Sequence, residues 1–272
     1  MHGFLEIMAW PFLACLVLTG IHAYLGLHVI EREVIFVDLA LAQVAALGSG
    51  IALLWGFGAE SAPSYWVSLG FTLAGAIIFS LSRLKKQKIP QEAIIGITYA
   101  VCAALLILVL SRSGEGDERI REALIGNILL VRPAEVLKMF FVYSGIGFFH
   151  ILFRKQFFLI SQDPQEAYRR GLRVRWWDFL FYASFGFVVT SSVRIAGVLL
   201  VFSYLVVPSA SAVLFSDSPK KRLLLGWAIG FMASVLGMVV SYFLDFPTGA
   251  SVVCVFGGTL IVLSLIKKYL PK

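Results

Sequence analysis

Nine mostly apolar stretches follow one another along the 272-residue chain and constrain its fold more than any other feature. Short polar or charged segments separate them, and they lie at roughly 7–28, 34–56, 65–82, 91–111, 135–153, 174–192, 195–215, 223–243 and 250–268. A helix needs about 20 apolar residues to cross the hydrocarbon core of a bilayer. Because lipid leaves no water to satisfy open backbone groups, each stretch should be a helix. We predict an all-α, polytopic bundle of about nine transmembrane helices, within a range of eight to ten.

The composition excludes the main alternatives. Hydrophobic residues make up 59% of the chain and charged residues only 14%, whereas a soluble domain carries about 25% charged residues. The stretches occupy most of the sequence, so we expect residues 1–272 to form a single transmembrane domain. A net charge of +7 would suit a nucleic-acid partner in a soluble protein. In a membrane protein, basic residues instead hold cytoplasmic loops at the lipid surface, and we expect no nucleic acid to bind.

The Lys and Arg residues predict the orientation. With the N-terminus outside and nine spans, most of the 23 basic residues fall on inner segments, as the positive-inside rule requires. We therefore place the N-terminus outside and the C-terminus in the cytoplasm, in a multi-pass protein of the plasma (inner) membrane. The weakest boundary is the expected break at Ser192-Val193-Arg194, because a kink there would change the number of spans.

Two connections are longer than turns. The outer one, 111–133, carries apolar residues at helical spacing after Asp117 and predicts an interfacial helix. In the inner one, 154–175, Asp163 can cap a short helix that starts at Pro164, and Gly171 can end it. A capped helix in a cytoplasmic loop suggests a docking element for a partner, and a plain solvated loop is the alternative.

Polar residues inside the spans are the candidates for function, because burying them in lipid is costly. Asp38 is the only acid clearly within a predicted span; it either pairs with a base near the span end or lines a pathway. Gln43 lies deeper and must find a partner across a helix interface or face a cavity. Histidines from neighbouring spans could bind a transition metal, although a lone histidine is more often packed. The metal ligands are therefore unknown, with Asp38, His22 and His28 as candidates.

Patterns typical of catalysis are not found in the sequence: it has no HExxH, no Walker A and no GxSxG motif. We therefore predict no catalytic residues and no enzyme activity for this chain. A proton-driven carrier usually needs a relay of buried acids, and Asp38 alone does not provide one. We expect another protein to supply the energy for transport, with a self-sufficient secondary carrier as an alternative.

Several segments, in shared order and spacing over nearly the whole chain, match motifs of one family. Its patterns G-D-I-L-L-V, D-P-E-x-A…G-L, V-R-x-x-G-V-L-L-V, L-x-I-P-A-A-x-A and S-Y-x-L-D-x-P-x-G-A correspond in order to residues 126–131, 163–172, 193–201, 205–212 and 241–250. The chain thus resembles the permease subunits of zinc/manganese/iron-type ABC importers. Such a permease forms a homodimer in membrane lipid and receives substrate from an extracytoplasmic substrate-binding protein.

The resemblance also implies how transport is powered. A cytoplasmic ABC ATP-binding subunit would hydrolyse ATP, and the permease itself would hold no permanent cofactor. Residues 161–172 would be the cytoplasmic coupling helix, whose contacts with the ATPase would come from Asp163, Pro164, Glu166, Ala167 and Gly171. The predicted translocation pathway comprises Asp38, Gln43, His22, Arg194 and Pro208.

The second span departs from the family pattern F-V-G-D-A-L-S-H-A-x-L-P-G. The family's Asp and His, four residues apart on one helix face, are taken to contact the metal. Here these positions are Leu39 and Gln43, while Asp38 comes one residue early and points about 100° away. Leucine cannot ligate, and an amide is a poor ligand for Zn²⁺ or Mn²⁺.

Three explanations remain open. Another set of side chains binds the ion, the ion passes without tight coordination, or the cargo is different. We predict an ABC permease for a divalent transition-metal ion (zinc, manganese or iron), with a metal chelate or another small cargo as the alternative.

Overall fold

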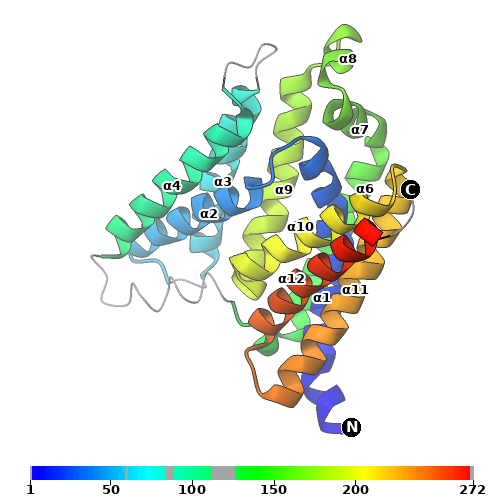
Figure 1. Cartoon of the computed structure of the whole chain (residues 1–272). Helices are drawn as coiled ribbons and strands as arrows, with labels where there is room; N and C mark the ends of the chain where they lie inside the picture. Colours follow the sequence, from blue (N-terminus) through cyan, green and yellow to red (C-terminus); the bar gives the residue numbers. More distant parts are fainter. Residues whose placement is uncertain (1, 59–60, 84–88, 112–125, 270–272) are drawn as a thin grey trace. The chain divides into compact units, whose positions relative to one another are not determined.

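The computed structural model describes residues 2–58, 61–83, 89–111 and 126–269, and side chains from residue 6 onward. Within these ranges the chain is helical and contains no strand (Figure 1). Nine of the described helices are long and apolar enough to cross a membrane, as predicted. They are α1 (His2–Glu31), α2 (Val37–Leu54), α3 (Ala62–Ser82), α4 (Gln91–Leu110), α6 (Pro133–Leu152), α9 (Val174–Ala196), α10 (Val198–Phe215), α11 (Pro219–Leu244) and α12 (Thr248–Tyr269).

Three shorter helices complete the described fold: the 3-10 helix η1 (Ile128–Leu130), α7 (Arg154–Gln162) and α8 (Pro164–Arg169). The predicted interfacial helix falls mainly on residues 112–125, outside the described residues, and η1 lies in the last part of the same connection. Helix α7 differs from the sequence prediction, in which residues 154–162 belong to a loop. Its residues 157, 160 and 161 are buried, so one face of α7 packs inward.

The boundary between α9 and α10 lies later than predicted. Helix α9 continues through Ser192-Val193-Arg194 to Ala196, and the chain turns at Gly197, whose φ is +77°. This left-handed conformation favours glycine. The charge of Arg194 had suggested a loop, whereas the glycine three residues later ends the helix.

The chain divides into two compact units. Unit 1 comprises residues 1–30, 124–147 and 194–272, and therefore most of α1 and α6 together with α10, α11 and α12. Unit 2 comprises residues 31–123 and 148–193, which include α2, α3, α4, α7, α8 and most of α9. Both units contain several spans, so the division falls within the transmembrane part of the protein.

In unit 1, α10, α11 and α12 lie side by side (Figure 1). The Tyr204 hydroxyl bonds Ser234 Oγ at 2.7 Å, and the Tyr204 ring meets Phe256 edge-on at 4.9 Å. On α11, a side chain added at Gly230 would lie 2.6 Å from Thr19 Cγ2 on α1. The small residue therefore permits close helix contact, as its GxxxG spacing with Gly226 predicts.

In unit 2, α2 packs against both α3 and α4. Ser68 Oγ on α3 donates to the Ala45 carbonyl on α2 at 2.8 Å. Farther along α3, Thr72 Oγ1 lies 3.0 Å from Thr190 Oγ1 on α9, and a Cβ at Gly186 would clash with Thr72. Hydroxyls and small residues thus hold these spans together, as is typical where helices associate in lipid.

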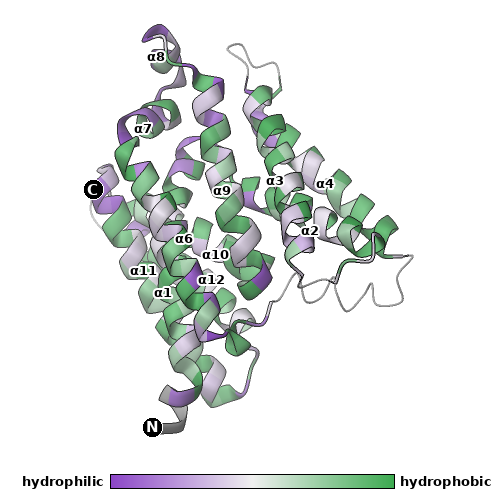
Figure 2. Ribbon diagram, turned by 180° about the vertical axis from the view of Figure 1, so that it is seen from behind, coloured by the Kyte–Doolittle hydropathy of each residue, from purple (hydrophilic) through white to green (hydrophobic). Residues whose placement is uncertain are grey.

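The surfaces of the spans are apolar. Figure 2 shows hydrophobic residues along the long helices and hydrophilic residues concentrated in α8 and parts of α7. On α4 and α6, large side chains such as Leu108, Phe141 and Phe148 are 65–68% exposed. In water such surfaces would promote aggregation, whereas facing lipid they are expected.

Candidate functional site

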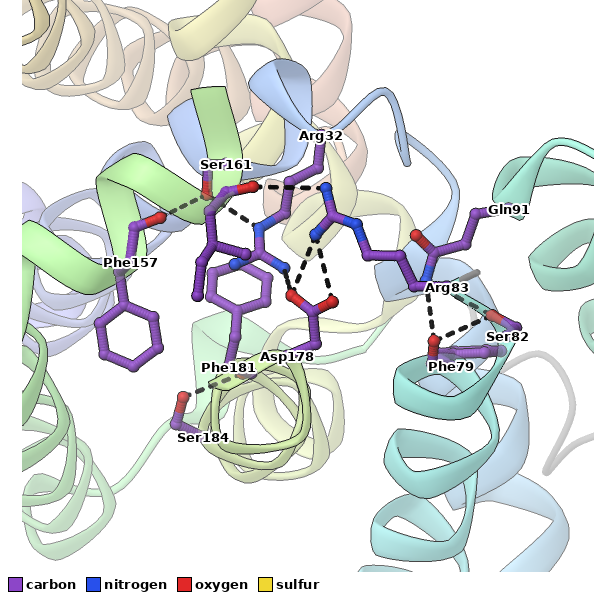
Figure 3. Close-up of polar contacts among 11 residues, drawn as sticks. Arg32, Phe79, Ser82, Arg83, Gln91, Phe157, Ser161, Asp178, Phe181 and Ser184 are labelled. Carbon is purple, nitrogen blue, oxygen red and sulfur yellow. Dashed lines mark hydrogen bonds and ion pairs between the residues drawn. The ribbon is translucent and has the colours of Figure 1, made fainter. Parts of the chain in front are cut away.

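A buried ionic cluster lies in unit 2 (Figure 3). Asp178 Oδ1 accepts from Arg32 Nη1 at 2.6 Å and from Arg83 Nη1 at 3.0 Å. The second oxygen, Oδ2, also lies 3.2 Å from Arg83 Nη1. The side chains of Arg32 and Asp178 are fully buried and that of Arg83 is 8% exposed, so water screens these interactions weakly. We call these three residues the arginine–aspartate cluster.

The cluster also contacts α7 (Figure 3). Arg32 Nε donates to Ser161 Oγ at 2.9 Å, and Arg83 Nη2 donates to the Ile160 carbonyl at 3.3 Å. The Arg32 guanidinium lies over the Phe181 ring, 4.0 Å from its centroid, in the geometry of a cation–π contact. The two arginines therefore connect α7 to α9 through polar and aromatic contacts.

The members of the cluster come from ends of elements that are distant in sequence. Arg32 lies in the turn between α1 and α2, Arg83 is the C-cap residue of α3, and Asp178 lies early in α9. Arg32 and Asp178 are separated by 146 positions. In the sequence, the positive-inside pattern marks both arginines only as basic residues of inner segments. Opposite charges at ends of spans on the same predicted side were the available signal.

The cluster contains two cations and one anion. Burying charges costs free energy that only good pairing and hydrogen bonding offset. The Phe181 ring offsets part of the cost for Arg32, but Arg32 Nη2 is buried and no described residue hydrogen-bonds it. The arrangement therefore fixes the positions of the groups that it joins.

Helix α8 has the capping predicted from sequence. The Asp163 side chain accepts from the Glu166 backbone N–H at 2.8 Å, and Pro164 is the first helical residue. Gly171 follows the helix with a φ of +76°. Glu166 pairs with Arg169 at 2.9 Å and Arg170 at 2.8 Å on the exposed side.

Ala167, the other residue predicted for coupling, lies on the inner side of α8. It is fully buried and forms an apolar cluster with Ile160 of α7 and Val174 of α9. A hollow of about 430 Å³ beside α8 is lined by Tyr168, Leu172, Arg173, Val174 and Arg175. Helix α8 thus presents charges outward while an apolar contact anchors it to two neighbouring helices.

Asp38 and Gln43 both lie on α2 in unit 2. Asp38 is 2% exposed, and its Oδ1 accepts from the Leu39 backbone N–H at 2.7 Å. Gln43 is 9% exposed, and its Oε1 is buried with no hydrogen-bond partner among the described residues. Glu92, which sequence reasoning did not single out, accepts from the Phe36 N–H at 3.0 Å and so joins the start of α4 to the start of α2.

The remaining pathway candidates belong to unit 1. His22 is buried on α1, where its Nδ1 lies 2.9 Å from the Leu18 carbonyl oxygen. Pro208 is buried within α10, and Arg194 is exposed in the last turn of α9. These positions locate the candidates, and their role in a pathway stays a prediction.

The three metal candidates are divided between the two units. No three His, Cys, Asp or Glu residues in the described ranges are placed to hold a metal ion. His22 and His28 are six residues apart on α1, which puts them about 120° apart around the helix. Asp38 belongs to the other unit. The set of Asp38, His22 and His28 therefore also stays a prediction.

Nine apolar spans among the described residues, many of them with exposed apolar side chains, define a multi-pass membrane protein. A family model identifies the class more closely. The chain belongs to the ABC 3 transport family, whose model matches residues 4–268. It is thus a multi-pass permease component of an ABC transporter in the plasma membrane, in agreement with the resemblance found in the sequence motifs.

Curated relatives cover most of the chain. The manganese import system permease protein ScaB of Streptococcus gordonii is 28% identical over 256 residues, 87% of this chain and 89% of ScaB. The manganese transport system membrane protein MntC of Listeria innocua is 26% identical over 71% of this chain and 70% of its own length. A probable iron transport system membrane protein of Haemophilus influenzae is 25% identical over 86% of this chain and 80% of its own length.

Solved structures share the fold. PsaBC from Streptococcus pneumoniae in complex with Fab superposes with a TM-score of 0.80 at 22% identity, covering 98% of each chain. An inward-facing, putative metal-chelate type ABC transporter superposes with a TM-score of 0.70 at 20% identity, covering 96% of this chain and 86% of its own. At these identities the comparison supports the nine-span fold and nothing finer.

Proposed function

We propose that this protein is the permease subunit of an ABC importer that carries a divalent transition-metal ion, manganese or iron, into the cell. The observation that carries the proposal is the family match over residues 4–268, together with relatives named for manganese import and iron transport. Zinc is a third candidate, from the resemblance in the sequence motifs.

The energy would come from a partner. In this proposal a cytoplasmic ABC ATP-binding subunit hydrolyses ATP, and an extracytoplasmic substrate-binding protein delivers the ion to a homodimer of the permease. Helix α8 is the docking element. Its outer side carries Glu166 with its paired arginines, and Ala167 anchors its inner side. Outward charges on an anchored helix suit a contact that must bind a partner and transmit force.

A metal chelate is the second candidate cargo. Leu39 and Gln43 stand where the resembled family has its Asp and His, so this face of α2 offers no pair of strong metal ligands. The unpaired, buried Gln43 Oε1 is a hydrogen-bond acceptor, which suits an organic ligand or a hydrated ion better than direct ligation. A chelated or hydrated metal would need fewer protein ligands during passage.

Reconstitution of the complete complex in liposomes tests the proposal. ATPase activity and uptake are measured with Mn²⁺, Fe²⁺ and Zn²⁺ in turn, each delivered with the binding protein. We expect ATP-dependent accumulation of at least one ion. Uptake of a metal only as a chelate would establish the second candidate. A complex that hydrolyses ATP without moving any metal, free or chelated, would refute both.

A further inference from the structure

Within unit 2, the arginine–aspartate cluster joins α7, next to the segment proposed to dock the ATPase, to the ends of α2 and α3. We infer that Arg32, Arg83 and Asp178 are positioning residues that transmit displacement of α7 and α8 to the ends of α2 and α3. The inference rests on the proposed function, because α8 must first contact an ATPase. We call this connection from α8 through α7 to the ends of α2 and α3 the linkage.

The first step of the linkage is apolar. Ala167 of α8, Ile160 of α7 and Val174 of α9 are each at most 1% exposed and form one cluster. Interiors packed this closely transmit strain because they have little free volume. Displacement of α8 is therefore expected to shift the C-terminal half of α7 with it.

The second step is polar and uses consecutive residues of α7. Ile160, already part of the apolar cluster, also accepts from Arg83 Nη2 through its carbonyl. Ser161 Oγ accepts from Arg32 Nε and itself donates to the Phe157 carbonyl within α7. Two arginines from different elements therefore hold one turn of α7, and a shift of this turn must change both contacts.

The third step joins the two arginines. Both donate to the same atom, Oδ1 of Asp178, so the position of one guanidinium affects the other (Figure 3). Arg32 lies five residues before the first residue of α2, Val37, and Arg83 immediately follows α3. Because α2 carries Asp38 and Gln43, the linkage ends at the helix that holds two pathway candidates.

The chemistry of the cluster suits the transmission of helix displacement better than the stabilisation of the fold. A buried ion cluster is a poor means of gaining stability, since well-packed apolar residues often stabilise as much or more. Directional hydrogen bonds, however, fix the register of the parts they join. Because Arg32 and Arg83 both contact α7 and Asp178, a displacement of α7 is expected to move both guanidinium groups.

The test uses the complete complex of permease, ATPase and binding protein in liposomes, and measures metal imported per ATP hydrolysed. Ser161→Ala removes one hydroxyl between α7 and Arg32, and Arg83→Gln removes one cation of the cluster. Ser80→Ala is the matched control, because this buried serine of α3 donates to the Ile77 carbonyl of its own helix. We expect the ratio to fall at least about fivefold in both test variants, the lower range of typical coupling between sites, and to stay at the wild-type value in the control.

A second readout separates transmission from stability. Hydrogen exchange at the turn between α1 and α2 is compared with and without ATP bound to the ATPase. We expect nucleotide to change exchange there in the wild-type complex and not in Ser161→Ala, although the ATPase still co-purifies. If Arg83→Gln fails to assemble, Ser161→Ala decides the question, since it removes no buried charge.

Unchanged coupling and unchanged nucleotide response in an assembled Ser161→Ala complex would overturn the inference while leaving the proposed function intact. Failure of the wild-type complex to import any metal with ATP would instead refute the proposed function. The two failures are thus distinguishable in one experiment.

Discussion

Leu39 and Gln43 stand where the resembled family has its Asp and His, so that pair of ligands is missing from this face of α2. Residues four apart on a helix share one face, so an Asp and a His at these positions would present two ligands side by side. Leucine offers no ligand, and the Gln43 amide is hard to reconcile with tight Mn²⁺ or Zn²⁺ binding. Asp38 cannot substitute, because it lies on another face of α2.

Restoring the pair should create a metal site on this face. We expect Leu39→Asp combined with Gln43→His to bind Mn²⁺ or Zn²⁺ at least about tenfold more tightly than wild type, equivalent to about 1.4 kcal/mol. Titration calorimetry on the purified complex measures the affinity. Leu39→Asn with Gln43→His is the control, since it preserves size but removes the carboxylate. Equal affinity in wild type and the double variant would show that this face of α2 does not meet the ion.

The sequence predicted the local roles of individual residues but not their contacts with residues far away in the chain. Asp163, Pro164 and Gly171 act within one short segment, so their capping role was predictable from local sequence and is confirmed. The arginine–aspartate cluster was not predicted. Its partners are far apart in the chain, and a loop arginine and a buried arginine look the same in a count of basic residues.

Helix α8 shows how a very short element can be stable enough to act. Six residues form too few hydrogen bonds to be helical in isolation. Asp163 satisfies one of the free N–H groups at the start, and the buried Ala167 supplies a tertiary contact. If α8 docks the ATPase, this local order presents the charged side of the helix in one conformation before the partner binds.

Removing the cap should weaken both the helix and its partner contact. We expect Asp163→Ala to destabilise α8 by about 1 kcal/mol, seen as faster hydrogen exchange in residues 166–170 and weaker retention of the ATPase on purification. Asp163→Asn keeps an acceptor for the Glu166 N–H and should preserve both properties. Loss of the ATPase in Asp163→Asn with normal exchange would mean that the negative charge contacts the partner directly.

The transmembrane helices were more predictable than the functional sites, because each helix is marked by one long, continuous apolar run in the sequence. The confirmed spans agree with the apolar runs within a few residues, since about 20 apolar residues and flanking polar groups mark each one. Helix α7 was missed because nine residues of mixed character look like a loop in sequence. The charge of Arg194 predicted that the span ends before this residue. In the structure α9 continues to Ala196, and Gly197 ends it.

At the scale of the whole molecule, the number of spans and the placement of the proposed partners must agree. The nine candidate spans among the described residues predict that the two termini lie on opposite sides of the membrane. The proposed ATPase contact requires α8 to be cytoplasmic, and the positive-inside rule predicts this location for α8 and for the C-terminal Lys267 and Lys268. Every functional proposal for α8 and the arginine–aspartate cluster therefore depends on this orientation.

The two turns that flank α11 provide a matched test of orientation. The Asp217 side chain is fully exposed before the helix, and Phe246 is 57% exposed after it. In a background with Cys15, Cys102 and Cys254 replaced by serine or alanine, Asp217→Cys and Phe246→Cys are treated with a membrane-impermeant thiol reagent. In intact cells we expect labelling of Phe246→Cys only, and labelling of Asp217→Cys after permeabilisation. The reverse pattern would put α8 outside the cell, where no ATP-binding subunit can reach it, and both the coupling proposal and the inferred linkage would fall together.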